Sequence, residues 1–458
     1  MSNPAASDTA DQAVVIGASV AGLLTASVLS AHFDRVLVLD RDLLPSTPEP
    51  RSMVQQEHHV HLLLQRGKLI IEGLLPGLME DLEREGALVA DLCLDVKCHH
   101  AGRWKRRWHS GITAHYCSRT LLEHVLRRRV SRIENVRIAA ATDVEGLIFD
   151  ETNRRVVGVN ARERNNTLRE IKAALVVDAG GRGSKAEQWL AGVGYGAVER
   201  EQIVTHLGYV SGIFEPPEGF RADWQVLLCL PKLPAQKQMA VVSPIEHGRW
   251  MVTAGAWFGQ QPTPDLTDFH DYLAKLPIPD LYEAVRSARL IGTLKRYRMP
   301  GGLRRRFDAM AEWPEGFLAI GDAVCSINPI YSQGMSASAL QVDAIRPHLH
   351  RVKGRRGACR ALQAAICQSV EHPWQQAAAV ERRFEGVGDR PSLSDRLRFA
   401  YFDRLLVASA VNRKAAIALL RVNNLMAGPE TLLGAGMVFR ALLAPIGARF
   451  SPHLGETL

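Results

Sequence analysis

Short apolar runs and a helical pattern alternate at the start of this chain. Residues 14–16 form a β-branched apolar run, residues 17–22 contain a glycine turn, residues 23–31 have helical spacing, and residues 36–39 form a second apolar run. Two apolar runs on either side of a glycine turn and a helical segment predict a strand-turn-helix-strand unit. The remaining elements are interpreted around this unit.

The next stretch predicts further helices and strands. A helix is expected over residues 62–86, interrupted by a Pro-Gly pair. Residues 87–117 alternate between apolar and polar positions, which indicates strands, and residues 119–133 have the spacing of an amphipathic helix. Three strands are predicted within residues 136–177, with the sequences VRIAA, RVVGVNARE and EIKAALVVD.

Strand patterns give way to helical patterns in the second half of the chain. Residues 195–300 predict a β-rich block with one helix near residues 266–275. Residues 316–322 predict another strand, a helix is expected to begin near Gly334, and the pattern from residue 357 onwards is helical. This order of elements predicts an α/β protein with a helical C-terminal region.

Composition and charge narrow the class of protein. The 458 residues are 47% apolar and 23% charged, which is ordinary for a globular protein. No run of about 18 uncharged apolar residues is present, so no transmembrane segment is expected. The net charge of +8 is dispersed in short basic groups that show neither an aromatic stacking pattern nor a known reading helix, so nucleic acid is not an expected partner. An N-terminus without signal-peptide features and seven cysteines without a C-x-x-C pair favour a cytoplasmic location.

The glycine turn predicts a dinucleotide site. Residues 17–22, GASVAG, match the pattern G-x-G-x-x-G except that Ser19 replaces the middle glycine. The N-terminus of the following helix attracts a pyrophosphate, because its first N–H groups have no partner within the helix. Asp40 ends the second apolar run, at the place where an acidic residue binds ribose hydroxyls. The alternative is a turn of the same shape that binds no ligand.

Three glycine-containing sites follow apolar strands in this sequence. They are GASVAG, VVDAGGRGS and FLAIGDAVCSINPIYSQGMSASALQ. Together they resemble, in order and spacing, the signature motifs of single-component flavoprotein monooxygenases, which have the fold of para-hydroxybenzoate hydroxylase. The resemblance implies a Rossmann-like FAD-binding domain with an interleaved β-sheet substrate domain.

The resemblance also implies a division into domains. We expect a disordered segment over residues 1–12 and a discontinuous FAD-binding domain over residues 13–190 and 301–356. A β-rich substrate domain is expected over residues 191–300, followed by a helical region over residues 357–458.

A narrower resemblance concerns the sequences HHVHLLL, VDAGGRGS and NPIYSQGMSASALQ. These are similar to bacterial flavin epoxidases of polyether antibiotic pathways (lasalocid epoxidase-like) and to squalene epoxidase-like proteins. The implied activity is the insertion of one oxygen atom from O₂ into a lipophilic small molecule through a flavin C4a-hydroperoxide, by epoxidation or hydroxylation in secondary metabolism. The implied electron donor is NADPH or NADH, used directly or through a separate flavin reductase.

The resemblance assigns FAD-binding roles to thirteen residues. Arg119 would contact the FAD phosphates, Asp322 would hold ribityl or ribose hydroxyls, and Asp178 and Arg182 would serve both FAD and the nicotinamide donor. Ala179 departs from the Asp-Gly pair that is typical of hydroxylases, which leaves nicotinamide handling open. The full set is Gly17, Ser19, Ala21, Gly22, Asp40, Arg41, Arg119, Asp178, Arg182, Gly321, Asp322, Gly334 and Met335.

Four residues are candidates for the vicinity of the flavin, namely His59, His61, Pro329 and Gly334. The two histidines are expected to share one strand face, and no carboxylate stands at metal-ligand spacing beside them, so no metal is expected. A helix that begins at Gly334 would stabilise negative charge on a reduced flavin. No catalytic acid or base is identified, and the lack of an evident buried base favours epoxidation.

The sequence leaves three questions open. The first is whether the helices after residue 357 cap a substrate channel, dimerise or touch a membrane. The second is whether the chain is instead an FAD-dependent reductase or dehydrogenase of the geranylgeranyl reductase type, or a non-catalytic flavin-binding partner protein. The third is whether the apolar positions of the β-rich block form a pocket wall or plain sheet core; these positions are Trp224, Val226, Leu228, Met239, Val241, Met251 and Trp257.

Overall fold

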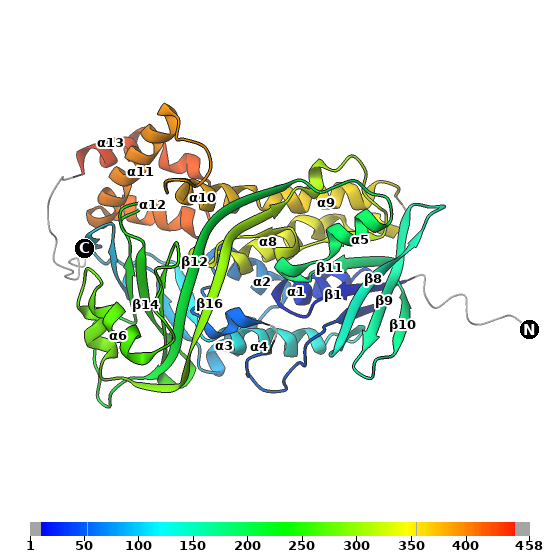
Figure 1. Cartoon of the computed structure of the whole chain (residues 1–458), viewed down its shortest axis with the longest axis horizontal. Coiled ribbons are helices and arrows are strands. Elements are labelled where there is room, and N and C mark those ends of the chain that lie inside the picture. Colours follow the sequence, from blue (N-terminus) through cyan, green and yellow to red (C-terminus); the bar gives the residue numbers. More distant parts are fainter. Residues whose placement is uncertain (1–10, 53, 354, 445–458) are drawn as a thin grey trace, which may run out of the picture.

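The computed structural model describes residues 11–52, 54–353 and 355–444. Of the segment predicted to be disordered, residues 1–10 lie outside the described residues, and strand β1 begins at Gln12. Figure 1 shows an elongated molecule with strands β8, β9 and β10 (within residues 142–172) at one end and helices α11, α12 and α13 (within residues 393–443) at the other.

A five-stranded parallel sheet is built around the first strand-turn-helix-strand unit. Its order is β17-β11-β1-β2-β7, and every neighbouring pair is parallel. Helix α1 packs against α4 and α8, and α9 packs against α8 and β17. The strands are β1 (Gln12–Ile16), β2 (Arg35–Leu39), β7 (Val136–Ala139), β11 (Leu175–Asp178) and β17 (Phe317–Ala319). The helices are α1 (Val20–Leu29), α4 (Arg119–Ser131), α8 (Gly334–Ile345) and α9 (Ala358–Ser369).

Residues 136–177 form more strands than the three that were predicted. Strand β8 (Thr142–Asp150) was not predicted; it pairs with β9 (Arg155–Glu163), which pairs with β10 (Leu168–Lys172). The predicted strand EIKAALVVD was wrong as one element, because it divides between β10 and β11, which belong to different sheets. The polar first part of this sequence belongs to β10, an edge strand of the antiparallel sheet. The apolar last part is β11, which is buried in the parallel sheet.

An eight-stranded sheet occupies the other half of the molecule. Its order is β18-β16-β12-β15-β14-β13-β4-β5. The long strands β12 (Arg200–Glu215) and β16 (Arg289–Arg305) run across the molecule in Figure 1 and join its two halves. The remaining strands are β4 (Val96–His100), β5 (Arg103–Trp104), β13 (Val226–Leu230), β14 (Gln238–Ile245), β15 (Arg249–Ala256) and β18 (Cys325–Ser326). A separate antiparallel pair consists of β3 (Leu88–Asp91) and β6 (Thr113–Tyr116).

The other helices agree with the sequence pattern. The interrupted helix predicted before residue 87 is the pair α2 (Gln65–Leu74) and α3 (Leu78–Arg84), and the helix predicted near residue 270 is α6 (Leu266–Ala274), followed by α7 (Asp280–Val285). The C-terminal region contains α10 (Glu371–Glu381), α11 (Leu393–Val411), α12 (Arg413–Asn423) and α13 (Ala435–Leu443). Short 3₁₀ helices include η1 (Gln55–His58), η2 (Gly181–Gly183), η5 (Gly321–Ala323) and η6 (Pro329–Tyr331).

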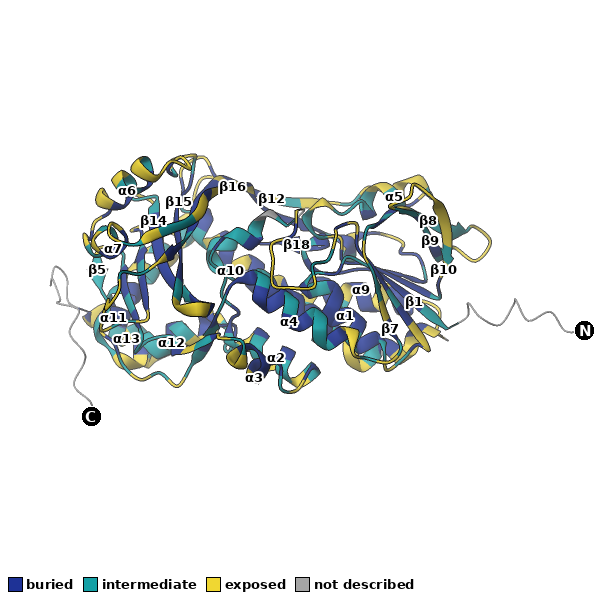
Figure 2. Ribbon diagram, turned by 90° about the horizontal axis from the view of Figure 1, so that it is seen from below, coloured by how far each residue is buried: buried dark blue, intermediate teal, exposed yellow. Residues whose placement is uncertain are grey.

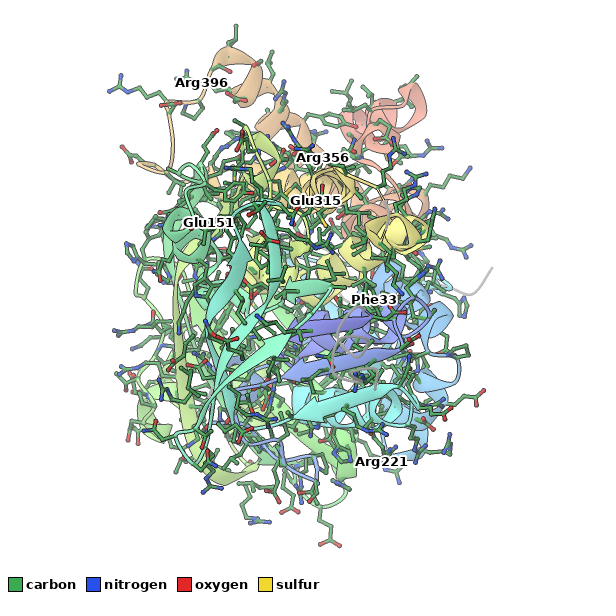
Figure 3. All side chains as sticks on the ribbon, turned by 90° about the vertical axis from the view of Figure 1, so that its right-hand side faces the viewer. Phe33, Glu151, Arg221, Glu315, Arg356 and Arg396 are labelled. Carbon is green, nitrogen blue, oxygen red and sulfur yellow. The ribbon has the colours of Figure 1, made fainter. Side chains whose placement is uncertain are left out.

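Burial and charge are distributed as in an ordinary globular protein. In Figure 2 the strands around β1 and the helices α1 and α9 are largely buried. Figure 3 shows Arg221, Arg356 and Arg396 well apart from one another, in keeping with dispersed basic groups. Among the described helices, none is long and apolar enough to cross a membrane.

Candidate cofactor and substrate site

The three glycine motifs lie against one another at the carboxyl ends of β1, β11 and β17. A Cβ atom on Gly17 would lie 2.6 Å from the carbonyl oxygen of Ala179, and one on Gly22 would lie 1.8 Å from the oxygen of Gly17. A Cβ atom on Gly321 would lie 2.6 Å from the Cβ of Ala21. Side chains at Gly17 and Gly321 would push the motifs apart, and one at Gly22 would disrupt the first turn itself.

The first turn leads into the N-terminus of α1. The first backbone bond of the helix runs from Leu23 N to Ser19 O, at 2.9 Å, so the N–H groups of Val20, Ala21 and Gly22 have no partner within the helix. These donors and the helix dipole form a suitable site for a phosphate group.

Asp40 lies beside this turn and is almost buried. One carboxylate oxygen accepts the N–H of Ala18 at 2.6 Å, and the other accepts the N–H of Asp42 at 2.8 Å. Asp40 therefore braces the glycine turn itself, and its predicted contact with a ribose stays a prediction. Arg41, the next residue, is exposed.

A buried network of charged side chains lies behind the turn. Ser19 Oγ donates to Glu123 at 2.6 Å, and Arg119 Nε donates to the same carboxylate at 2.7 Å. Arg51 joins Glu123 to Glu57, with 3.0 Å between Arg51 Nε and Glu57 Oε1. Burial acts to raise the pKa of Glu123, but Arg119 and Arg51 outweigh it and lower that pKa.

Sequence reasoning missed three members of this network, Arg51, Glu57 and Glu123. The spacing of Arg119 and Glu123, four residues apart on a predicted helix, was a signal for one of its ion pairs. The residue predicted to meet the FAD phosphates, Arg119, has its Nη2 atom 3.2 Å from Ser19 Oγ. It thus lies directly at the glycine turn.

The second and third motifs are joined by hydrogen bonds. Asp178 accepts the N–H of Gly180 at 2.8 Å and the hydroxyl of Ser184. Arg182 Nη1 donates to Ser326 Oγ at 3.3 Å, and that hydroxyl lies 3.5 Å from Asp322. Burial raises the pKa of both Asp178 and Asp322. For Asp322, Arg119 and Arg182 oppose this shift, which places both cations within electrostatic range of its carboxylate.

A tight turn connects the third motif to α8. Asn328 Oδ1 accepts the N–H of Ile330 at 3.2 Å, Pro329 opens η6, and Ser332 has a left-handed φ of 55°. A Cβ atom on Gly334, the first residue of α8, would lie 3.9 Å from Asp322 Oδ1. Met335, which follows, is buried. The start of α8 and the acidic group of the third motif therefore share one site.

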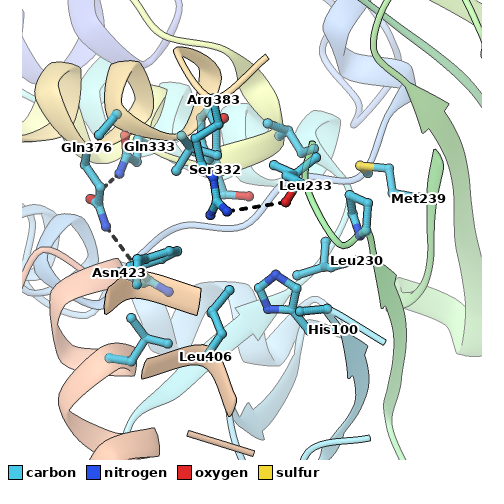
Figure 4. A pocket seen from close by; sticks show the side chains of 18 of the residues that line it. His100, Leu230, Leu233, Met239, Ser332, Gln333, Gln376, Arg383, Leu406 and Asn423 are labelled. Atoms are coloured by element: carbon cyan, nitrogen blue, oxygen red, sulfur yellow. Dashed lines mark hydrogen bonds between the residues drawn. The ribbon is translucent and has the colours of Figure 1, made fainter. Parts of the chain in front are cut away.

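A pocket of about 1350 Å³ lies beside this turn (Figure 4). The turn contributes Pro329, Ile330, Tyr331, Ser332 and Gln333 to its lining. Five of the seven apolar positions proposed as a wall also line it: Val226, Leu228, Met239, Val241 and Trp257. Of the other two, Trp224 packs against Phe220 and Trp250, and Met251 is buried in β15.

The C-terminal helices cover the pocket. Leu405, Leu406 and Leu419 from α11 and α12 line it. A polar chain ties these helices to the turn: Gln333 Nε2 donates to Gln376 at 2.7 Å, and Gln376 donates to Asn423 at 3.0 Å (Figure 4). Of the roles left open for this region, a cap over the channel is the one that these contacts support.

His59 and His61 both line the pocket, but the expectation of a shared strand face was wrong. They follow η1 in irregular backbone. His59 Nδ1 lies 2.7 Å from Ser211 Oγ, and His61 Nδ1 donates to the oxygen of His59 at 2.7 Å. Burial lowers the pKa of His59 to about 3 and that of His61 to about 4, so both rings are neutral at pH 7. In the described part of the chain, no group of three or more His, Cys, Asp or Glu side chains forms a candidate metal site.

One further buried carboxyl belongs to this region and was missed. Glu381, at the end of α10, is 1% exposed and accepts hydrogen bonds from Asn328 and Thr205. Burial raises the pKa of Glu381 to about 7. Glu381 is not among the residues that line the pocket, so the expectation that the site offers no buried base to the substrate stays a prediction. Nothing in the helical pattern of α10 marked this glutamate, because its partners are distant in sequence.

Residues 10–350 match the family described as FAD binding domain, and the chain belongs to this family. It is also similar to Protein Rv3254 of Mycobacterium tuberculosis, with 33% identity over 367 residues that cover 78% of this chain and 76% of that protein.

Two solved structures share the fold at low sequence identity. The flavin-dependent brominase Bmp2 has a TM-score of 0.65 and 16% identity, covering 94% of this chain and 98% of the brominase. The p-nitrophenol 4-monooxygenase PnpA from Pseudomonas putida DLL-E4 has a TM-score of 0.63 and 17% identity, covering 92% and 99%. The α/β fold with a helical C-terminal region is thus confirmed as a flavoprotein fold.

The residues present fit an FAD molecule. The glycine cradle and the helix N-terminus suit its pyrophosphate. Within the described residues, several buried polar atoms at the pocket have no hydrogen-bond partner and are available to polar edges of a cofactor or substrate. These atoms are His59 Nε2, Tyr209 Oη, Tyr331 Oη and Gln333 Oε1.

Proposed function

We propose that this protein is an FAD-dependent monooxygenase that inserts one oxygen atom from O₂ into a lipophilic small molecule. The observation that carries the proposal is the position of the pocket. Pro329 and Tyr331, in the turn before α8, line the same pocket as the apolar sheet residues Val226 and Val241. A substrate in this pocket would lie beside the turn at which the resemblance places the flavin.

Each part of the site would have a separate task. Bound FAD would supply the activation of O₂ and the transfer of one oxygen atom. Gly17, Ser19, Gly22 and the N-terminus of α1 would hold the pyrophosphate, aided by Arg119. The apolar walls and the C-terminal helices would keep water away from the reaction.

The other predicted residues complete this proposal. Asp40 and Asp322 would meet hydroxyl groups of FAD, and the start of α8 would face the flavin. The division into an FAD-binding domain (residues 13–190 and 301–356), a substrate domain (residues 191–300) and a helical region is part of the proposal. So are a cytoplasmic location and a role in secondary metabolism.

Epoxidation and hydroxylation both remain candidates for the reaction. The narrower sequence resemblance favours epoxidation of a polyketide or terpenoid. Attack on a phenol would benefit from a nearby base, but the buried carboxyl of Glu381 is not among the residues that line the pocket. Product analysis with a panel of polyenes and phenols distinguishes the two.

The test of the proposal is oxygen transfer itself. Purified protein is expected to be yellow with bound FAD and to incorporate one atom of ¹⁸O₂ into a product from the panel. Colourless protein that binds no added FAD contradicts the proposal at its first step. Turnover without label in the product instead supports the reductase or dehydrogenase alternative, and FAD binding without NAD(P)H or O₂ consumption supports a non-catalytic partner.

The electron donor is tested separately. Rapid mixing with NADPH or NADH alone is expected to bleach the flavin if the donor acts directly. If bleaching requires an added flavin reductase, the reductase is a necessary partner.

A further inference from the structure

Glu381 connects three elements around the turn between β18 and α8. It lies at the C-terminal end of α10 and accepts a hydrogen bond from Asn328 Nδ2 in the turn. Thr205 of β12 donates its hydroxyl to the same oxygen, Oε1, at 3.3 Å. Glu381 thus holds the turn between a helix of the C-terminal region and a strand of the eight-stranded sheet.

The bond from Asn328 to Glu381 fixes the orientation of the amide. With Nδ2 directed to Glu381, the Oδ1 atom of Asn328 accepts the N–H of Ile330 at 3.2 Å. Asn328 is 1% exposed, and both its Nδ2 and its Oδ1 atom have a hydrogen-bond partner within the protein. A change at Glu381 is therefore transmitted through two hydrogen bonds to the backbone that leads into α8.

The groups that face Glu381 leave its charge uncompensated. Its hydrogen-bond partners Asn328 and Thr205 are neutral, and so is Trp257, which also acts to lower its pKa. The ionisable neighbours are Tyr209 of β12 and Tyr331 of the turn, and burial together with nearby groups raises the pKa of each well above 10. Both tyrosines are neutral near pH 7. Protonation of Glu381 is therefore the local change of charge that occurs in this pH range.

We propose that Glu381 is a positioning residue that holds the turn from Asn328 to Gln333 and takes up a proton when FAD bound beside this turn is reduced. This inference rests on the proposed function, because it requires bound FAD. Two electrons and one proton convert FAD to its anionic reduced form, and a second proton converts the carboxylate of Glu381 to the carboxylic acid. A new negative charge in an enclosed site disfavours a second one, which supplies the coupling.

The pKa of Glu381 in the protein with oxidised FAD makes this coupling effective near neutral pH. Burial raises the pKa of Glu381 to about 7, and the hydrogen bonds from Asn328 and Thr205 act in the opposite direction. Above this pKa the carboxyl is ionised while FAD is oxidised, so a further increase in its pKa on reduction draws in a proton. Below this pKa the carboxyl is already protonated, and the coupling fades.

The experiment measures the midpoint potential of the bound FAD against pH. FAD-loaded protein is titrated with dithionite and reference dyes from pH 6 to 8.5, for the wild type, Glu381→Gln and the exposed control Glu385→Gln. Glutamine keeps an acceptor for Asn328 and Thr205 but cannot take up the proton. Between pH 7 and 8 the slope of potential against pH is expected to be steeper in the wild type and in Glu385→Gln, up to twice that of Glu381→Gln.

Two further readouts keep the test decisive if Glu381→Gln folds poorly. Thr205→Val removes a hydrogen bond that lowers the pKa of Glu381, so the steep region should move to higher pH. Infrared difference spectra of reduced minus oxidised wild type at pH 8 should contain a new carboxylic acid C=O band. Equal slopes in the wild type and Glu381→Gln, an unmoved steep region in Thr205→Val, or no new band would each overturn the role of Glu381. Failure of the wild type to bind FAD would instead contradict the proposed function.

Discussion

Gly321 and Ala21 are in such close contact that a Cβ atom on the glycine would lie 2.6 Å from the Cβ of the alanine. This contact holds the turn after β17 against the first turn of α1, although the two residues lie three hundred positions apart in sequence. Gly321 also has a φ of +70°, which side-chain-bearing residues rarely adopt. The geometry of the candidate FAD site therefore depends on the absence of a side chain at one position.

Gly321→Ala is expected to damage both stability and FAD binding. The added methyl group would meet Ala21 and strain the backbone, at a cost of about 1–3 kcal/mol. Thermal unfolding and the FAD absorbance of the purified protein measure the two effects. Gly183→Ala is the matched control, because a Cβ atom there has nothing within 4 Å and Gly183 lies in the neighbouring motif. A Gly321→Ala protein with normal FAD content would contradict the assignment of this site.

Asp40 and Ser19 are expected to differ in their importance for FAD. Asp40→Ala removes the acceptor for the N–H groups of Ala18 and Asp42, so it loosens the turn as well as any contact with the ribose. Loss of charge-assisted hydrogen bonds worth about 1.5–3 kcal/mol weakens FAD binding by about tenfold or more. Ser19→Gly restores the usual glycine and should keep FAD bound, because Arg119 still pairs with Glu123.

Fluorescence titration of FAD into apoprotein measures both variants. Unchanged affinity in Asp40→Ala would count against the whole FAD assignment. A large loss in Ser19→Gly would instead show that the hydroxyl of Ser19 has a role beyond its bond to Glu123.

The elements around the glycine motifs could be predicted because their signals are local. Apolar runs, glycine turns and helical spacing are properties of neighbouring residues, and parallel strands bring their carboxyl ends to one edge of the sheet. The boundary between β10 and β11 was missed because EIKAALVVD is continuous in β propensity, while its halves pair with different partners. The strand propensity of a segment does not determine which neighbouring strand it pairs with.

The side-chain networks could not be predicted for a related reason. Ser19 and Glu123, or Asn328 and Glu381, are far apart in sequence and meet only after the sheets have formed. A buried glutamate in an ordinary helical pattern resembles an exposed one until the packing around it is known. Arg119 and Glu123 were the exception, since a separation of four residues on one helix is itself a signal.

His59 is expected to make folding stability depend on pH. In the folded chain burial lowers its pKa to about 3, whereas an unfolded histidine titrates near 6.5. The unfolded state therefore binds more protons below pH 6.5, and stability falls as the pH decreases from there towards 3. A single group of this kind contributes at most about 1.4 kcal/mol per pH unit.

Urea unfolding of the apoprotein between pH 4.5 and 7 measures this contribution. His59→Gln should flatten the decrease in stability at acidic pH, and the exposed His109→Gln should leave it unchanged. If the two variants behave alike, His59 is not held as a neutral ring in the folded protein.

Leu228 is the position at which the substrate pocket can be blocked without touching the FAD-binding motifs. Leu228 lies in β13 and lines the pocket, whereas its neighbour Leu227 is buried in the core on the other face of the sheet. Leu228→Trp would place a large ring in the space that an apolar substrate needs, at a cost of about 1–3 kcal/mol. Substrate binding should weaken by about tenfold to a hundredfold while FAD affinity is retained.

The control Leu168→Trp adds the same ring at an exposed position on β10 and should leave both substrate binding and FAD affinity unchanged. Binding is followed through the perturbation of the flavin spectrum by the substrate found in the product screen. Equal substrate affinity in Leu228→Trp and the wild type would mean that the substrate is bound elsewhere.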